Sequence, residues 1–266
     1  MNTTGKHGRD EGRVTVSLDG TIAHVIFDRP SAYNALTWKM YDELAEACRV
    51  INDDLRARVA VFRGGGGRSF IAGTDIRQFQ DFSSGEDGIA YENKMERIVE
   101  GVESLRVPTI VVVEGYAAGA GLAIACACDI RIAATGARFG VPVARTVGNC
   151  LAPGTLRRLV TALGQSWVQR MLLLAEMPTA EMVSPTGFLA SVVPAEDLDT
   201  QIEETCAKLL SHAPITMSVT REMLRRLAIN PSADASDLIR ICYASDDFRA
   251  GVRAFGKKAV PQWQGR

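Results

Sequence analysis

The chain has 266 residues, 47% of them hydrophobic, and its 30 basic and 31 acidic side chains give a formal net charge of −1. This length and hydrophobic content allow a large core in one domain. The balanced charge, without a cluster of Lys and Arg, argues against nucleic acid or an anionic membrane surface as the main partner. No apolar run reaches the ~20 residues that a bilayer span requires.

The first residues and the cysteines bear on the compartment. Residues 1–13, MNTTGKHGRDEGR, are polar and lack the apolar centre of a signal peptide, so we expect a flexible N-terminus over residues 1–12. The six cysteines suit reduced thiols of a cytoplasmic protein better than a disulfide framework. Cys126 and Cys128 do not form a CxxC pair and histidines are scarce, so no metal site is expected.

Strand and helix patterns alternate in the first half of the chain. Residues 14–28 alternate in polarity and turn at Asp19-Gly20, which predicts a β-hairpin. Two helices are predicted, over 37–56 and 89–106. Their apolar faces are Met40, Leu44, Cys48, Ile51 and Leu55 in the first and Ile89, Met95, Ile98, Val102 and Leu105 in the second. Short buried strands are predicted at 59–64 and 109–115, and residues 71–79 lead towards a helix.

Helices dominate the second half of the chain. Short strands at 129–134 and 137–142 flank a turn at Gly136. Helical patterns then cover 153–164, 166–176, 179–189 and 195–212, interrupted by one strand at 190–194 and followed by two or three more helices. This order predicts an α/β core over residues 13–200 and a helical C-terminal segment over residues 201–266.

Two loops follow buried strands and enter helices: SFIAGTDI at 69–76 and EGYAAGAGLA at 114–123. The start of a helix leaves N–H groups unpaired and carries partial positive charge. If the loops converge, one N–H from each can bind a single oxygen as negative charge develops on it. Alternatively, Gly119 and Gly121 only allow close packing of helix on sheet.

Four segments, in this order and spacing, carry a family resemblance: FDRPSAYNALTWKMYDEL, SFIAGTDIRQF, EGYAAGAGLAIACACDIRIAA and ASDDFRAGVRAFGKKAVPQWQG. Together they resemble the crotonase superfamily of enoyl-CoA hydratases and isomerases over residues 12–265. The resemblance implies a spiral of ββα units with a helical C-terminal segment that forms trimers, often stacked as hexamers. It also implies an acyl-CoA thioester substrate whose carbonyl oxygen is held by the backbone N–H groups of Ala72 and Ala120.

The resemblance further implies the contacts of coenzyme A, which is part of the substrate, so no separate cofactor is expected. The matching residues are Ser31, Ala32, Tyr33, Ala35, Ile71, Gly73, Thr74, Asp75, Ile76, Tyr116, Gly119, Val143 and Lys258. Ser31 stands where the family often has a basic residue. Asp75 fits a helix cap better than a chemical role, and Lys258 fits a solvent-exposed lysine at least as well as a contact to CoA of a neighbouring subunit.

Both acids of the usual hydratase mechanism are missing by this resemblance. Typical hydratases of the family use two glutamates, and the matching positions are Ala123 and Val143. Loss of a general acid or base removes a factor of about 10²–10⁴ each. The standard two-glutamate hydration mechanism therefore does not carry over to this chain.

Three nearby polar residues are candidates for the chemistry. Arg145 is a candidate clamp for a substrate carboxylate, or else part of a surface salt bridge. Asn149, with Thr146 and Cys150, is a candidate for the acyl pocket, although a buried inert thiol is the default for Cys150. Glu114 is a candidate proton donor, or else a structural carboxylate at a strand end.

Three functions stay open on the sequence. The first is an acyl-CoA lyase or isomerase of the enoyl-CoA hydratase type with relocated acids. The second is a decarboxylase of carboxyacyl-CoA esters, because decarboxylation needs enolate stabilisation more than it needs a base. The third is a non-catalytic acyl-CoA binder, since a fold by itself does not fix activity.

Overall fold

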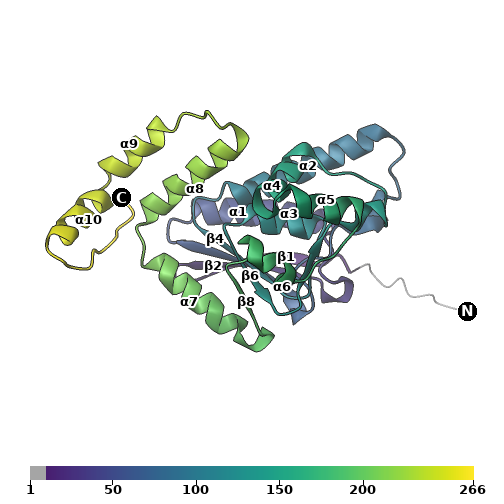
Figure 1. Ribbon diagram of the computed structural model, residues 1–266, viewed down its shortest axis with the longest axis horizontal. Coiled ribbons are helices and arrows are strands. Elements are labelled where there is room, and N and C mark those ends of the chain that lie inside the picture. The colour runs from purple at the N-terminus through teal and green to yellow at the C-terminus, as the bar shows by residue number, and fades with distance from the viewer. Residues whose placement is uncertain (1–9) are drawn as a thin grey trace, which may run out of the picture.

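A six-stranded sheet with the order β1-β2-β3-β4-β6-β8 forms the centre of the computed structural model, which describes residues 10–266 (Figure 1). Its strands are β1 Arg13–Asp19, β2 Ile22–Asp28, β3 Val59–Gly64, β4 Thr109–Val113, β6 Ile130–Ala134 and β8 Ser191–Val193. Of the predicted flexible segment 1–12, residues 1–9 lie outside the described residues.

The predicted hairpin is confirmed. Strands β1 and β2 pair antiparallel with Val16 opposite Val25, and Gly20 takes a positive φ of 57° in the turn between them. From β2 onward every neighbouring pair in this sheet is parallel. Parallel neighbours require crossover connections, and helices supply them here, as expected for an α/β fold.

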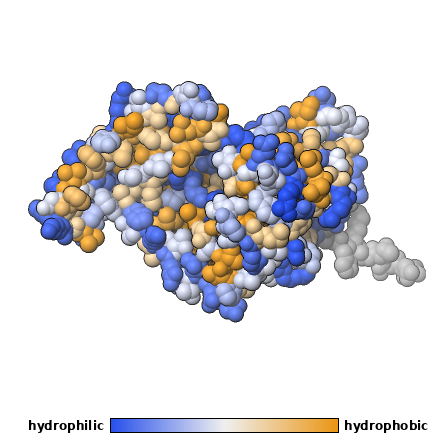
Figure 2. Space-filling model, in the orientation of Figure 1, coloured by the Kyte–Doolittle hydropathy of each residue, from blue (hydrophilic) through white to orange (hydrophobic). Residues whose placement is uncertain are grey.

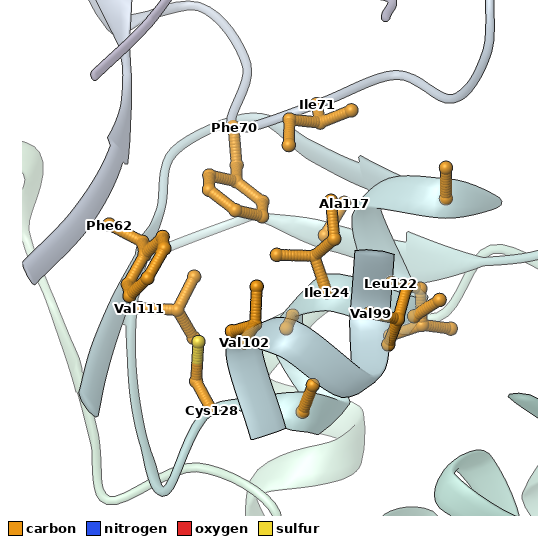
Figure 3. Packing of buried hydrophobic residues seen from close by; sticks show 14 of the residues in the cluster. Phe62, Phe70, Ile71, Val99, Val102, Val111, Ala117, Leu122, Ile124 and Cys128 are labelled. Carbon is orange, nitrogen blue, oxygen red and sulfur yellow. The ribbon is translucent and has the colours of Figure 1, made fainter. Parts of the chain in front are cut away.

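Helices cover both faces of the sheet, and each face has its own core. On one face lie α1 Trp38–Asp53, α2 Gly85–Glu103, α3 Ala120–Ala127, α4 Pro153–Leu163 and α5 Gln165–Leu173 (Figure 1). There Phe62 and Val111 of the sheet pack with Val102 of α2 and Ile124 of α3 (Figure 3). The alternate strand residues Val61 and Ile110 face the other way. Burial on both faces explains why these strands are uniformly apolar.

The second face is covered by α7 Leu198–Leu210, whose Leu198, Ile202 and Cys206 pack against Val61 and Ile110. The predicted boundary at residue 200 therefore falls inside α7, a helix that packs on the sheet of the core. Beyond it, α8 Pro214–Ile229, α9 Ser236–Ala244 and α10 Asp246–Gly256 project away from the sheet (Figure 1). No helix within residues 10–266 combines the length and apolar character needed to cross a bilayer.

Short elements complete the chain. A second sheet pairs β5 Tyr116–Ala118 parallel to β7 Arg138–Gly140. The short helix α6 Ala180–Val183 precedes β8. Single 3₁₀ turns lie at Pro30–Ala32, Gly65–Gly67, Ile76–Phe79, Pro142–Ala144, Ser184–Thr186 and Ala195–Asp197.

Three details of the predicted elements are wrong. Leu55 is not part of the apolar face of α1, because the helix ends at Asp53 and Leu55 is 83% exposed. Ile89 is likewise exposed on the first turns of α2, before that helix reaches the core. Residues 71–79 enter only a 3₁₀ turn, Ile76–Phe79, which Asp75 caps by accepting the N–H of Arg77.

Candidate active site

Three loops lie side by side at one end of the sheets: residues 31–36, 71–75 and 115–120. The N–H of Leu36 donates to the Gly73 carbonyl at 2.8 Å, and the N–H of Asp75 donates to the Leu36 carbonyl at 2.9 Å. On the other side, the N–H of Ala118 donates to the Ile71 carbonyl at 2.9 Å. These backbone bonds hold loop 71–75 between the other two, so the convergence that the sequence predicted is present.

Glycines let the start of α3 approach loop 71–75 closely. A Cβ atom at Gly121 would lie 2.2 Å from the Ile71 carbonyl oxygen, and one at Gly119 would lie 3.7 Å from the Cα of Gly73. Gly119 also takes a positive φ of 52° immediately before the helix. These glycines therefore do allow close packing, and the same packing brings the start of α3 next to Gly73, so the structure does not choose between the two roles.

A cavity of about 280 Å³ opens between these loops and the helices α2 and α4. Most of its wall is apolar, with alanines from α3 and larger side chains from α2 and from the loop after β7. It is lined by Ala72, Gly73, Thr74, Ile76, Phe79, Tyr91, Glu92, Met95, Ala118, Gly119, Ala120, Ala123, Pro142, Val143, Thr146, Val147, Asn149, Leu151 and Thr155. Its size is near the lower end of small-molecule sites, about 300–1,000 Å³.

The two predicted backbone donors differ in their hydrogen bonding. Ala120 is the first residue of α3, and within residues 10–266 no group accepts a hydrogen bond from its N–H. The N–H of Ala72, by contrast, donates to the Tyr33 carbonyl at 3.1 Å. The N–H of Ala72 is therefore engaged by the neighbouring loop in this structure, and its role as the second donor stays a prediction.

One carboxylate lines the cavity, and it is a residue that the sequence analysis missed. Glu92 projects from α2, and its Oε2 accepts the N–H of Ala152 at 2.7 Å, at the start of α4. Burial raises the pKa of Glu92 and the nearby Glu96 adds to this, while the hydrogen bond from Ala152 works against it. A raised pKa makes a carboxylate a stronger base, which suits a group that takes and returns a proton.

Glu96, one turn further along α2, is committed elsewhere. It lies 2.6 Å from the buried Arg158 guanidinium of α4, which also contacts Glu103 at 2.8 Å. Arg158 is therefore shared by two carboxylates, and Glu92 has no cation as a partner among the described residues. The sequence does contain a sign that these carboxylates share one side of α2. Glu92, Glu96 and Glu103 are spaced 4 and 7 residues apart, beside the apolar face of the helix.

Three hydroxyl groups form a chain along the wall beside Glu92. The Thr74 Oγ1 lies 2.8 Å from the Tyr91 hydroxyl and 2.5 Å from the Tyr41 hydroxyl. Burial raises the pKa of both tyrosines. These hydroxyls therefore stay protonated and act as hydrogen-bond donors or acceptors rather than as bases.

Comparisons with known proteins agree with this geometry. Residues 17–266 match the model of the family described as enoyl-CoA hydratase/isomerase. The chain belongs to this family. It is 29% identical to a crotonyl-CoA hydratase of Syntrophomonas wolfei over 92% of this chain and 95% of that protein. It is also 29% identical to the (E)-benzylidenesuccinyl-CoA hydratase of Thauera aromatica, over 95% of this chain and 99% of that protein.

A solved structure confirms the family fold. An enoyl-CoA hydratase/carnithine racemase from Magnetospirillum magneticum has a TM-score of 0.88 and 26% identity, over 98% of this chain and all of that one. The predicted resemblance to the crotonase superfamily and its fold of ββα units with terminal helices are therefore correct. For this member of the family, Ala123 and Val143, where the resemblance places the two glutamates, both line the cavity.

Two of the predicted catalytic side chains are not in the cavity of this enoyl-CoA hydratase/isomerase family member. Arg145 is exposed and does not line the cavity, so the structure gives no support to the predicted clamp and favours the surface alternative. Glu114 is buried at the end of β4 and pairs with Arg63 at 2.8 Å, which favours the structural alternative. Asn149 does line the cavity, and its Oδ1 is buried without a hydrogen-bond partner within the described chain. Cys150 is exposed rather than buried.

The predicted CoA contacts fall into two groups. Those in the cavity wall are Gly73, Thr74, Ile76, Gly119 and Val143. The others lie outside it, and Ser31, Ala32, Tyr33, Ala35, Ile71 and Tyr116 belong to the converging loops and their flanks. Tyr33 and Tyr116 pack edge to face at 6.2 Å, with Arg68 over the Tyr33 ring at 4.4 Å.

Asp75 takes the capping role predicted for it, and a contact of Lys258 with CoA of a neighbouring subunit stays a prediction. Asp75 caps the turn Ile76–Phe79 and pairs with Arg29 at 2.9 Å and Arg77 at 2.5 Å, so its carboxylate is fully used in the protein. Lys258 is exposed after α10, outside the cavity.

Proposed function

We propose that this protein binds an acyl-CoA thioester and stabilises its enolate in a reaction of the enoyl-CoA hydratase or isomerase type. One observation carries the proposal: the unpaired N–H of Ala120 opens onto an apolar cavity beside loop 71–75. A thioester oxygen bound there gains negative charge as the enolate forms. The N–H and the positive end of α3 stabilise that charge more strongly in an apolar site than they would in water.

Binding of the substrate follows from the arrangement of the loops. The acyl group occupies the cavity, while the CoA part leaves along loop 31–36 and the exposed Tyr33 and Tyr116 rings. The thioester oxygen meets the Ala120 N–H first. It engages the Ala72 N–H as a second donor by sharing it with the Tyr33 carbonyl or by displacing that bond. No further cofactor takes part in this proposal.

The cavity disfavours the decarboxylase alternative. No cation lines the cavity within the described chain, so a substrate carboxylate would lose its water there without gaining a charged partner. Arg145, the predicted clamp for a substrate carboxylate, is exposed and does not line the cavity. Electrostatic selection therefore favours neutral acyl groups over carboxyacyl groups.

We also propose that the protein is a homo-oligomer, a trimer or a hexamer. The projecting helices α8–α10 carry exposed apolar side chains along much of their surface (Figure 2). These are Leu224, Leu227, Ile229, Ile239, Ile241, Tyr243, Phe248, Val252 and Phe255. An apolar surface of this extent, on helices that leave the core, favours burial against another copy of the chain.

The test is incubation of the purified protein with a panel of CoA esters, followed by mass spectrometry. The panel contains 2-enoyl, 3-enoyl and carboxyacyl esters. We expect turnover of enoyl esters, seen as addition of water or as a change in retention without a change in mass, and no loss of CO₂ from carboxyacyl esters. Binding without turnover of any ester would leave only the acyl-CoA binder, and absence of binding would refute the proposal.

A further inference from the structure

The cavity carboxylate gives the proposed function a specific mechanism. Resting on that function, we infer that Glu92 is the catalytic acid and base of this protein, and that it moves one proton between two carbons of an enoyl thioester. The residue comes from α2, away from the two positions where the family resemblance places its glutamates. Those positions are occupied by Ala123 and Val143, which have no exchangeable proton.

The placement of Glu92 fits contact with the acyl group. Glu92 lines the same cavity as Ala120 and Ala123, which both belong to α3. The N–H of Ala120 has no acceptor within residues 10–266. Helix α2 packs directly on α3, with Val99 near Leu122 (Figure 3). Since the side chains of Ala120 and Ala123 are small, they leave the space between α3 and α2 to the substrate.

The hydrogen bonding of Glu92 leaves one oxygen for chemistry. Oε2 is held by the Ala152 N–H at 2.7 Å, and Oε1 has no hydrogen-bond partner within residues 10–266. A bond to one oxygen fixes the orientation of the carboxylate, as a positioned base requires. The free oxygen Oε1 is therefore the atom that we assign to proton transfer.

The surrounding charges keep Glu92 available. Arg158 is bound by Glu96 and Glu103, and no cation lines the cavity within the described part of the chain. A cation at Glu92 would stabilise the carboxylate and weaken it as a base. Arg158 is therefore committed to Glu96 and Glu103, which leaves Glu92 in surroundings that favour uptake of a proton.

The step starts from a 3-enoyl thioester. The C–H bond at carbon 2 breaks, its proton moves to Oε1 of Glu92, and the electron pair delocalises over the dienolate to the thioester oxygen at the Ala120 N–H. The dienolate then takes the same proton from Oε1 at carbon 4, and the double bond lies between carbons 2 and 3. Atoms and electrons balance without water, oxidant or metal.

A single carboxylate suits this proton shift better than hydration. Water addition needs one group to activate the water and a proton donor for carbon 2, and the usual mechanism divides this work between two residues. The wall around Glu92 otherwise offers Tyr91, Thr74 and Asn149 as polar groups, none of which is ionised. We therefore assign 3-enoyl-CoA esters as the substrate class.

The experiment compares wild type, Glu92→Gln and Glu92→Asp on 3-enoyl-CoA in D₂O, with Glu86→Gln as the matched control. Glu86 is exposed on the first turn of α2, outside the cavity. We expect wild type in D₂O to return mainly the original proton to carbon 4, so that its product carries little deuterium there, and we expect Glu92→Gln to bind the ester as wild type does and to lose at least about 100-fold in isomerisation. Glu92→Asp should retain part of the activity, and the control all of it.

The outcomes separate this inference from the proposed function. Wild-type turnover that persists within 3-fold in Glu92→Gln would refute the role of Glu92 and leave the acyl-CoA function intact. Hydration by wild type that is lost in Glu92→Gln would support the residue and refute the proton shift. A wild type that neither binds nor changes any CoA ester would refute both. If Glu92→Gln fails to fold, Glu92→Asp decides: a folded variant that still binds the ester but keeps only part of the isomerisation supports the positioned Oε1, and full wild-type activity refutes it.

Discussion

At the scale of single residues, the cavity wall favours the neutral forms of its ionisable groups. Burial raises the pKa values of Tyr41, Tyr91 and Glu92, and in α3 it raises that of the Cys126 thiol to about 12. The common cause is desolvation, because an apolar wall stabilises a charge less than water does. Glu92 is the group of this set whose raised pKa moves towards neutral pH.

The raised pKa of Glu92 predicts a pH dependence of stability. Between its unfolded and folded pKa values the folded chain binds more protons, so the free energy of unfolding falls as pH rises through that window. Glu96 and Tyr91 on α2, and Arg158 on α4, are the ionisable groups around it, while α3 contributes only Ala and Gly to the cavity.

Glu92→Gln should remove this slope, because the amide keeps the bond to the Ala152 N–H and does not ionise. We expect its melting temperature to match that of wild type below the usual carboxylate pKa of about 4.3 and to equal or exceed it at pH 8. Thermal melts of both proteins across this range test the expectation. A variant that is less stable than wild type at pH 8 would contradict it.

The backbone donor at Ala120 can be removed without losing the helix. Proline is accepted at the first position of a helix and has no N–H. We expect Ala120→Pro to lower turnover of enoyl-CoA by about 10²–10³-fold, the usual cost of one oxyanion donor, with its added ring also crowding the site. The control is Ala120→Gly, which keeps the N–H and should stay active. Full activity of a folded Ala120→Pro variant, shown by circular dichroism, would exclude the assigned oxyanion site.

At the scale of elements, the site depends on how closely α3 packs on loop 71–75. The eight residues of α3 follow Gly119, which has a positive φ, and Gly121 leaves no room for a Cβ beside Ile71. The backbone bonds between loops 31–36, 71–75 and 115–118 then set the position of the first turn. Helix α2 completes the cavity, since it is anchored to α4 through Arg158.

Gly121→Ala tests this packing. The added methyl would lie 2.2 Å from a backbone oxygen, so α3 or the loop must shift. We expect destabilisation of about 3 kcal/mol or more, the upper end of overpacking effects, together with loss of activity. Gly101→Ala is the control, because Gly101 lies inside α2 with free space around it and should gain about 0.5–1 kcal/mol. Denaturant unfolding of both variants measures the difference, and equal stabilities would contradict the packing account.

At the scale of the whole molecule, the sheet-bearing core and the projecting helices differ in their surfaces. The core has helices on both sheet faces, whereas α8–α10 extend away from it with apolar side chains exposed (Figures 1 and 2). A helix pair or triplet with this composition is stable only when its apolar side is covered. The cover that we propose is a second copy of the chain.

The double substitution Leu227→Asp and Ile241→Asp tests this cover. Both side chains are about half exposed, so charges there are tolerated by a single chain but not in an apolar interface. We expect dissociation to monomers by light scattering, with the far-ultraviolet circular dichroism of wild type. Asn230→Asp, a polar exposed position after α8, is the control for added charge. A wild-type monomer, or an oligomer that survives both substitutions, would contradict the proposal.

Much of the fold was predictable because local signals agreed with the tertiary structure. Alternation and the Asp19-Gly20 turn predicted the first hairpin, and the apolar run 59–64 matched β3 residue for residue. The predictions were wrong where an element ended or had not yet reached the core, as at Leu55 and Ile89. Periodicity marks which side chains share a face but does not show how far along a helix the core extends.

Only the part of the site that is formed by backbone groups could be predicted from the sequence. The sequence by itself determined that a glycine-rich loop starts a helix at Ala120 and that Ala123 and Val143 carry no acid, since these follow from residue type and order. Only the tertiary structure decided which carboxylate reaches the cavity: it brought Glu92 in from α2, paired Glu114 with Arg63 and left Arg145 in solvent. The reason is physical, because a side chain acquires its chemistry from the burial and charges that distant segments place around it.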